Sequence, residues 1–273
     1  MGKIYEALLR AEESETQKLE GGNGTAERLL PIISTNGFDP QKELVVLGKP
    51  GSAIAEQFRF WRSQVICPQD NFRPRTIQIT SSLQGEGKTF AACNLAVTIS
   101  QGLDEHVLLV DMDMRNSRMS RIFGFKEDVR GLSAHLAEDT PLEELLKKTK
   151  LKKLTILPAG TSVDKPAELV SSSRMKEFIK EVRDRYPDRY VIIDSPPIEM
   201  APESLVISKE VEGIFLMVLR AKTPRDRVAT SLEKLQKEKF LGVILNGDQQ
   251  PNKQYQGYKY EKGYSYSYGY CYK

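Results

Sequence analysis

Short apolar runs alternate with longer amphipathic stretches along most of the chain after Arg75. The runs read TIQIT, HVLLVDM, LTILPA, YVIID, GIFLMVL and FLGVILN, and the amphipathic stretches between them lie near residues 89–101, 173–186, 202–210 and 225–238. Continuous apolar strands alternating with amphipathic helices are typical of a parallel sheet with both faces covered. The pattern predicts an α/β fold with a mostly parallel central sheet flanked by helices on both faces. In such sheets, ligands bind at the carboxyl ends of the strands.

A different pattern precedes the predicted sheet. Residues 14–40 are polar and glycine-rich, as expected of a linker. Before them, residues 3–13 predict a short amphipathic helix whose apolar face carries Ile4, Ala7, Leu8 and Ala11. A second helix is predicted from about Ser52 to Ile66, because apolar side chains recur there at helical spacing, at Ile54, Phe58, Trp61 and Val65.

The chain ends KGYSYSYGYCYK, and no Ala, Val, Ile, Leu or Met follows Leu245. Such a stretch cannot bury enough apolar surface to offset the entropy of ordering it, so a mobile tail is predicted. A mobile segment rich in exposed hydroxyls is typical of a modification substrate. Eight of the eleven tyrosines lie here, at Tyr255, Tyr258, Tyr260, Tyr264, Tyr266, Tyr268, Tyr270 and Tyr272. The predicted organisation is a helix and flexible linker over 1–43, a folded domain over 44–248 and a tyrosine-rich tail over 249–273.

Composition narrows the class of protein. At 273 residues, the chain suits one sizeable α/β domain with extensions, or two small domains. The net charge is +3, and the tail from Pro251 onward itself carries +3, so the charge balance gives no support for a nucleic-acid partner. The cysteines are far apart and form no CxxC motif, so we expect neither a disulfide framework nor a zinc site at Cys67, Cys93 and Cys271. A reducing cytoplasm fits this usage.

No apolar run approaches the roughly 18 to 20 residues that span a bilayer. The start, MGKIYEALLRAEES, lacks a hydrophobic signal-peptide core, and Glu6 stands where an N-myristoylation motif needs Ser or Thr. We therefore expect a cytoplasmic protein that reaches the inner face of the cell membrane through a partner.

The first predicted strand runs into the stretch SSLQGEGKTF and then into a helix. Residues 82–89 fit the P-loop pattern with serine in place of the first glycine, S-x-x-x-x-G-K-T. The two glycines let the loop turn its N–H groups toward phosphate, Lys88 is predicted to reach the β- and γ-phosphates, and the Thr89 hydroxyl to ligate Mg²⁺. A glycine-rich turn without function is the alternative, but the strand–loop–helix context favours a P-loop. The predicted nucleotide-binding residues are Gly85, Glu86, Gly87, Lys88, Thr89 and Phe90.

Acidic residues follow two other predicted strands. Asp111 and Asp113 come at the end of LLVDMDMR, and they project to the same side if the strand continues through both. Asp194 ends VIIDSPP. If these strands flank the P-loop strand, the three carboxylates converge near the γ-phosphate, where a cation such as Mg²⁺ is needed to offset their repulsion. A single aspartate after a strand is often only a turn residue, but two such strands beside a P-loop favour a site.

These segments resemble a known family. SLQGEGKT, LLVDMDMR and VIIDSPP look like the Walker A, A′ and B motifs of the bacterial tyrosine kinases that regulate exopolysaccharide synthesis, and ILPAG, KPAEL and the tyrosine cluster match as well. The resemblance covers about residue 44 to the end. It implies a P-loop kinase domain that binds ATP and Mg²⁺ and phosphorylates its own tail tyrosines, largely in trans within a ring of copies.

The resemblance also suggests roles for the acidic residues. Lys88 and Mg²⁺ would stabilise the transferring phosphoryl group, and Asp111 would orient or deprotonate the incoming tyrosine, whose pKa near 10 leaves little phenolate at neutral pH. Asp113 and Asp194 would hold Mg²⁺, although the spacing leaves open which aspartate is the base. Asn246, after the last strand, resembles the position that contacts adenine in the family; the alternative is a turn residue.

AEQFRFWRS supplies the family's E-x-x-R-x-x-R pattern as Glu56, Arg59 and Arg62. These residues lie on one helical face, either as a solvated charged face or, as the family implies, as a contact between copies. The start, KIYEALLRAEE, resembles the leader of kinases found beside exosortase-type systems. The implied partners are further copies of the chain, a membrane polysaccharide co-polymerase or chain-length regulator, and a cognate tyrosine phosphatase.

Two other functions compete with the tyrosine autokinase. One is a non-kinase P-loop switch ATPase of the chromosome-partitioning or septum-placing type. Leu83 opposes it, because those ATPases usually carry a lysine early in the loop, and the tyrosine tail opposes it too. The other is a catalytically silent scaffold whose tail self-associates, which the full set of P-loop and acidic residues opposes.

Overall fold

The computed structural model describes residues 43–68, 72–125, 129–161, 163–184 and 189–247. The predicted helix at 3–13, the linker that follows it and the eight tail tyrosines lie outside these residues.

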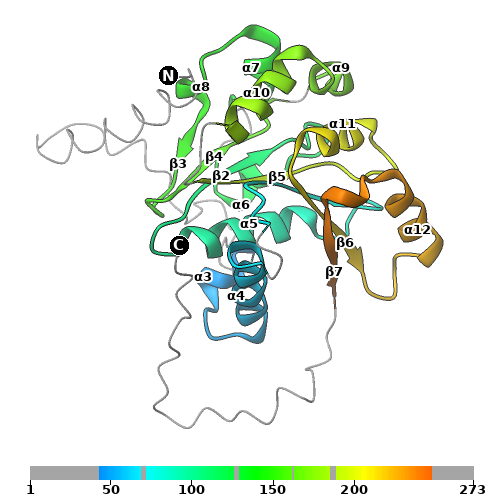
Figure 1. Ribbon diagram of the computed structural model, residues 1–273. Coiled ribbons are helices and arrows are strands. Elements are labelled where there is room, and N and C mark those ends of the chain that lie inside the picture. The colour runs from blue at the N-terminus through cyan, green and yellow to red at the C-terminus, as the bar shows by residue number, and fades with distance from the viewer. Residues whose placement is uncertain (1–42, 69–71, 126–128, 162, 185–188, 248–273) are drawn as a thin grey trace, which may run out of the picture.

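A seven-stranded sheet forms the centre of the described domain (Figure 1). Its order is β3-β4-β2-β5-β1-β6-β7, and all pairs are parallel except β3 with β4. The strands are β1 (Thr76–Ser81), β2 (His106–Asp111), β3 (Lys147–Lys148), β4 (Leu154–Leu157), β5 (Arg189–Asp194), β6 (Gly213–Leu219) and β7 (Phe240–Asn246). All six predicted strands are confirmed. The sequence analysis missed β3, because two lysines give no apolar run to recognise.

Helices cover both faces of this sheet, as predicted (Figure 1). Before β2 and just after it lie α3 (Val45–Gly48), α4 (Ala53–Ile66), α5 (Lys88–Ser100) and α6 (Met119–Ile122). The helices between α6 and β5 are α7 (Leu132–Glu138), α8 (Leu142–Leu145), α9 (Pro166–Val170) and α10 (Ser173–Asp184). The last are α11 (Pro202–Glu210), α12 (Arg225–Lys234) and the 3₁₀ helix η1 (Lys237–Lys239).

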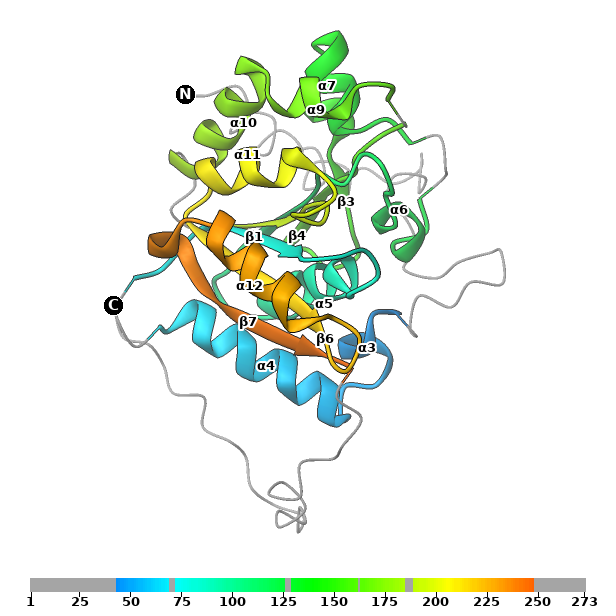
Figure 2. The ribbon, with the colours of Figure 1, turned by 90° about the vertical axis from the view of Figure 1, so that its right-hand side faces the viewer.

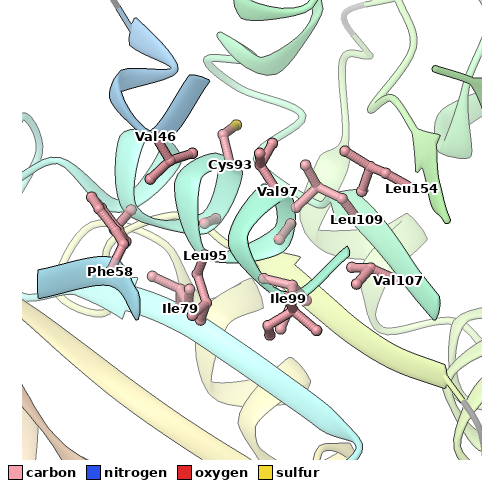
Figure 3. Packing of buried hydrophobic residues seen from close by; sticks show 14 of the residues in the cluster. Val46, Phe58, Ile79, Cys93, Leu95, Val97, Ile99, Val107, Leu109 and Leu154 are labelled. Atoms are coloured by element: carbon pink, nitrogen blue, oxygen red, sulfur yellow. The ribbon is translucent and has the colours of Figure 1, made fainter. Parts of the chain in front are cut away.

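The helix after the P-loop, α5, is buried almost all round. Every residue except Phe90 is buried, because the helix lies between the sheet and the pair α3 and α4. Figure 3 shows Leu95 and Ile99 of α5 packed near Ile79, with Val97 close to Leu109. This enclosure fixes the direction of α5, and with it the P-loop at its amino end.

The helix α4 begins where it was predicted, because the Ser52 side chain caps it by accepting a hydrogen bond from the Ala55 N–H at 3.2 Å. Phe58, Trp61 and Val65 face the core as expected. The prediction for Ile54 is wrong, since its side chain is 49% exposed. Ala55 takes its place on the buried face, because it lies three residues before Phe58 and so on the same side of the helix.

Strand order decides which acidic residues lie near the P-loop. β5 lies between β1 and β2, so only the strand carrying Asp194 flanks the P-loop strand. The strand carrying Asp111 is one position further away, which corrects the expectation that both strands flank β1. The two acidic strands are themselves neighbours, and Asp111 and Asp194 are paired in register.

Candidate active site

The P-loop takes the shape that its glycines predict. β1 ends at Ser81 and α5 begins at Lys88, so the loop joins a buried strand to a helix amino end. Gly85 and Gly87 have φ angles of +83° and +93°, in the left-handed region that favours glycine. A Cβ at Gly87 would also overlap Asn246 Nδ2. The loop presents its backbone and the helix amino end toward the cavity, an arrangement suited to phosphate.

The buried Glu86 side chain stabilises the loop through hydrogen bonds. Its Oε2 accepts a hydrogen bond from the Leu83 N–H at 2.9 Å, and Oε1 accepts one from the Thr223 hydroxyl. Asn246 Nδ2 donates to the Glu86 carbonyl at 3.0 Å. Because the carboxylate is occupied in this way, the predicted nucleotide contact of Glu86 falls to its backbone amide. The sequence analysis missed Thr223, which lies 137 positions away in the loop after β6.

Lys88 makes a buried contact with one of the predicted acidic residues. Its Nζ lies 3.1 Å from Asp113 Oδ2, and both side chains are more than nine-tenths buried. The strand β2 ends at Asp111, so Asp113 does not continue the strand as expected. Instead the chain turns, with the Asp113 N–H donating to Asp111 Oδ1 at 3.0 Å. This turn brings Asp113 to Lys88.

Asp111 is fully buried and held by two donors. Oδ1 accepts the Asp113 N–H, and Oδ2 accepts the Ser117 hydroxyl at 2.6 Å. Burial raises the pKa of Asp111 well above its ordinary value, and the neighbouring charge of Asp194 raises this pKa further. The two hydrogen bonds lower the pKa of Asp111 and fix the orientation of its carboxylate. Ser117 was missed by the sequence analysis, although it follows the acidic motif directly in DMDMRNS.

Asp194 lies beside Asp111 with no donor of its own. Its side chain is fully buried, and neither carboxylate oxygen has a hydrogen-bond partner among the described atoms. The net effect raises the pKa of Asp194 from 3.8 to about 6. Burial is the main cause and the Asp113 charge adds to it, while the Lys88 charge and the nearby Thr89 hydroxyl lower the pKa in part. Unpartnered buried carboxylate oxygens are rare in folded proteins and call for an unplaced ion or water.

This group of carboxylates fits a magnesium site that nucleotide completes. Among the described residues, no set of three or more His, Cys, Asp or Glu side chains is arranged to hold a metal ion by itself. Mg²⁺ is usually held by one or two carboxylates together with substrate phosphates and water. The open oxygens of Asp194, close to Thr89 and the P-loop, suit that mode of binding.

A cavity of about 550 Å³ opens at the P-loop. Five of the six predicted nucleotide-binding residues of the loop line it, namely Gly85, Gly87, Lys88, Thr89 and Phe90, whereas Glu86 does not. Residues that the sequence analysis did not single out also line it, namely Glu43, Gln84, Asn116, Ser117, Arg118, Arg121 and Ile122. Two arginines and a lysine around one cavity suit a polyphosphate ligand.

Asn246, at the end of β7, contacts the P-loop but is not among the residues that line this cavity. Its Nδ2 reaches the loop carbonyl of Glu86, and its Oδ1 accepts the Gly247 N–H at 2.8 Å. The residue therefore both shapes a turn and borders the P-loop, so the adenine contact stays a prediction.

The three residues of the E-x-x-R-x-x-R pattern lie on α4, away from the P-loop cavity. Arg59 pairs with Glu56 and donates to the Pro50 carbonyl at 2.8 Å. Arg62 lies 3.5 Å from Glu105, which precedes β2. The pattern thus has partners within one chain, and its role between copies stays a prediction.

Comparison with known proteins adds an independent finding. A family model described as an AAA domain matches residues 74–211. Tyrosine-protein kinase YwqD of Bacillus subtilis (strain 168) is 32% identical over 231 residues, which cover 84% of this chain and 96% of that protein.

Two solved structures are similar as well. The crystal structure of the chimerical protein CapA2B2 is 30% identical with a TM-score of 0.67, covering 86% of this chain and 97% of that one. The septum site-determining protein MinD from Pyrococcus horikoshii, complexed with Mg-ADP, is 27% identical with a TM-score of 0.52, covering 63% of this chain and 69% of that one.

No helix in the part of the chain that the structure describes is long and apolar enough to cross a bilayer.

Proposed function

Because the chain belongs to the bacterial tyrosine kinase family, whose members transfer phosphate from ATP to protein tyrosine, we propose that it phosphorylates its own C-terminal tyrosine cluster, largely in trans, and thereby regulates exopolysaccharide synthesis or export. The observation that carries the proposal is the set formed by Lys88, Asp111, Asp113 and Asp194 beside the P-loop. Lys88 supplies a cation for the phosphates, and Asp111 supplies a carboxylate held in a fixed orientation. Asp194 supplies carboxylate oxygens without a partner among the described atoms, which are available to a metal ion at the carboxyl ends of the strands.

ATP binds with its phosphates against the loop between β1 and α5, and Mg²⁺, when bound, neutralises phosphate charge and aligns the transferring group. Thr89, Asp113 and Asp194 would hold the ion, the two aspartates through water. Lys88 lies at the end of the loop, and its ammonium group contacts Asp113. When the nucleotide enters, this ammonium group exchanges the carboxylate for phosphate oxygens. Asn246 borders the base end of the site.

Asp111 is the group we assign to the tyrosine hydroxyl. Its two hydrogen bonds, from the Asp113 N–H and the Ser117 hydroxyl, fix the carboxylate before the substrate arrives. Burial raises its pKa, which makes it a stronger proton acceptor than an exposed aspartate. The carboxylate orients the phenol and receives its proton as the new bond forms between the phenol oxygen and the γ-phosphorus and the bond from that phosphorus to the departing ADP breaks.

The tail begins next to the site, because β7 ends at Asn246 and this residue contacts the P-loop. The 23 residues from Pro251 to Lys273, taken as a flexible chain, would have a root-mean-square span of roughly 24–29 Å, enough to reach their own site or a neighbour's. We propose that a ring of copies selects the neighbour. Eight phosphates would add about −12 to −16 charges to a tail of +3, so phosphorylation is expected to loosen the ring.

Intact mass spectrometry after incubation with Mg²⁺-ATP tests the activity. We expect successive mass steps of one phosphate, located on tail tyrosines and absent from a full-length control in which all eight are phenylalanine. ATP consumption without mass steps would instead identify a switch ATPase. A chain that neither gains phosphate nor consumes ATP would be a silent scaffold.

A mixing experiment tests transfer in trans. The phenylalanine-tail protein keeps its active site and lacks acceptors, whereas a Lys88→Met protein keeps its acceptors and lacks the phosphate-binding cation. Together they are expected to give phosphotyrosine on the Lys88→Met chains, distinguishable by mass. Phosphorylation of wild type alone, with none in the mixture, would show that transfer occurs within one chain.

Replacing Arg59 and Arg62 by alanine is expected to reduce self-association while the monomer stays folded. The exposed Arg59–Glu56 pair is worth at most about 1 kcal/mol to the monomer, whereas the Arg62–Glu105 pair is mostly buried and its loss costs more, so cooperative thermal unfolding is used to confirm that the variant is folded. Light scattering measures the mass distribution, and alanine at Arg130 and Arg174, two exposed paired arginines elsewhere, is the matched control. An unchanged mass distribution in the α4 variant would count against the interface.

The remaining partners follow from the family. We propose that the kinase acts at the cytoplasmic side of the membrane, held there by a polysaccharide co-polymerase or chain-length regulator, and that a cognate tyrosine phosphatase reverses its modification. These assignments rest on the proposed activity and on the family resemblance of the N-terminal leader.

A further inference from the structure

Exposed apolar side chains gather in one groove between α4 and β7. The groove has a volume of about 890 Å³ and is floored by core residues such as Phe58, Phe215 and Met217. Of the seven large apolar side chains exposed in the described residues, five line it, namely Ile54, Phe60, Phe72, Val243 and Leu245. Single exposed apolar residues are ordinary, but a contiguous group beside a groove marks a binding surface.

The groove runs along an open sheet edge. Within the described chain β7 pairs with β6 and with no other strand, and α4 lies alongside it (Figure 2). Natural edge strands usually carry charges or proline that discourage further pairing. β7 reads FLGVILN and has neither. An extended segment can add to such an edge while its side chains enter the adjacent groove.

The groove also contains a polar group without a partner in the described chain, the indole N–H of Trp61. Trp61 is the only tryptophan of the chain, lines the groove and is 8% exposed. Its indole Nε1 is buried and has no hydrogen-bond partner among the described atoms. Buried indole N–H groups normally find an acceptor, so the groove lacks one that an occupant would provide.

The chain itself provides a segment that fits. Residues 29–33 read LLPII, which is the densest aliphatic run outside the described residues. The described chain starts at Glu43, which lines the P-loop cavity together with Phe90, and Phe90 also lines the groove. Nine residues separate Ile33 from Glu43, and the ten steps between their Cα atoms extend to at most about 36 Å. The 14-residue helix α4 is about 21 Å long, so the run can reach any part of the groove.

We propose that residues 29–33 of the chain bind in the α4–β7 groove, alongside the free edge of β7. Leu30 and Ile32 alternate with Pro31 and enter the groove, and a backbone carbonyl of the segment accepts the Trp61 N–H. Pro31 has no N–H and therefore faces away from β7, which an edge position tolerates. The segment ties the N-terminal region to the face of the domain that borders the nucleotide site.

This occupant fits better than the tail. The tail also starts beside the groove, at Gly247, but it has no aliphatic side chain after Leu245 to fill an aliphatic and aromatic surface. The amphipathic stretch at 3–13 offers fewer large apolar residues, and a longer linker separates it from Glu43. A second copy of the chain is a further alternative, and the experiment distinguishes it by mass.

The test compares two full-length variants. Leu30→Asp with Ile32→Asp places charges in the proposed segment, and Ile4→Asp with Leu8→Asp makes the same change in the stretch at 3–13. Binding of the apolar dye bis-ANS reports an open groove, and amide hydrogen exchange reports protection of β7. Light scattering gives the mass, and cooperative thermal unfolding confirms that each variant is folded.

We expect the Leu30/Ile32 variant to bind at least about threefold more bis-ANS and to exchange the β7 amides at least about tenfold faster, at unchanged mass. A synthetic peptide of residues 26–36 should reverse both effects, and the Ile4/Leu8 variant should resemble wild type. Three results would overturn the proposal: no change in the Leu30/Ile32 variant, the same change in the Ile4/Leu8 variant, or a change that appears only as the protein dissociates into smaller species.

Discussion

Lys88→Met is expected to lower tyrosine phosphorylation by about 10³-fold. The lysine is the one cation that the described fold buries beside the carboxylates, and loss of a positioned charge that stabilises a transferring phosphoryl group typically costs this much. Phosphate incorporation over time, measured by intact mass at saturating Mg²⁺-ATP, gives the ratio of rates. Residual activity above one tenth of wild type would contradict the assignment.

The same substitution has a structural effect that must be separated from the catalytic one. Asp113 would keep its buried charge without its partner, and removal of one member of a buried pair destabilises a protein by about 3–5 kcal/mol. The double variant Lys88→Met with Asp113→Asn removes both charges, so it should recover most of the unfolding free energy while staying inactive. Recovery of activity together with stability would mean that Lys88 acts only through folding.

Asp194→Asn is expected to stabilise the nucleotide-free protein at neutral pH and to lower phosphorylation by at least about 10²-fold. The folded carboxyl has a pKa of about 6 against an ordinary 3.8, so the folded state keeps a proton that the unfolded chain releases. The stability contributed by this group is therefore full below pH 3.8 and is lost as the pH rises through 6. The total loss is about 3 kcal/mol, which the asparagine variant avoids.

Denaturant unfolding of both proteins between pH 4 and 8, with EDTA and no nucleotide, measures this effect as a difference in free energy. Carboxyl groups far from Asp194 titrate in the same range and cancel in the difference, whereas Asp111, whose pKa the Asp194 charge raises, changes with it, so the difference reports the pair. Asp164→Asn, the same change at an exposed position, is the control and should follow wild type. Mg²⁺ with ADP should reduce the difference in unfolding free energy between wild type and Asp194→Asn, because the cation offsets the buried charge of Asp194. A difference that does not vary with pH would show that the Asp194 pKa is not raised.

The local elements of this protein follow from the sequence. The apolar runs determine six strands, because all but the edge strand β7 are mostly buried on both faces. The glycines at 85 and 87 determine the loop, because only glycine readily takes its φ angles. Ser52 determines where α4 begins. The acidic residues at the ends of two strands were also recognisable from the sequence. An aspartate that directly follows an apolar run lies where the strand ends, at the carboxyl end of the sheet.

Tertiary structure decided which of these residues meet. Periodicity along a chain does not contain the order of strands, so the position of β5 between β1 and β2 was not predictable, nor was the turn that brings Asp113 to Lys88. Thr223 reaches Glu86 across 137 positions, and Ser117 reaches Asp111 through a short turn that no apolar pattern marks. The groove likewise exists only because β7 ends the sheet beside α4. Contacts between distant segments depend on how whole elements pack, and packing is settled by the complete fold and not by any one stretch of sequence.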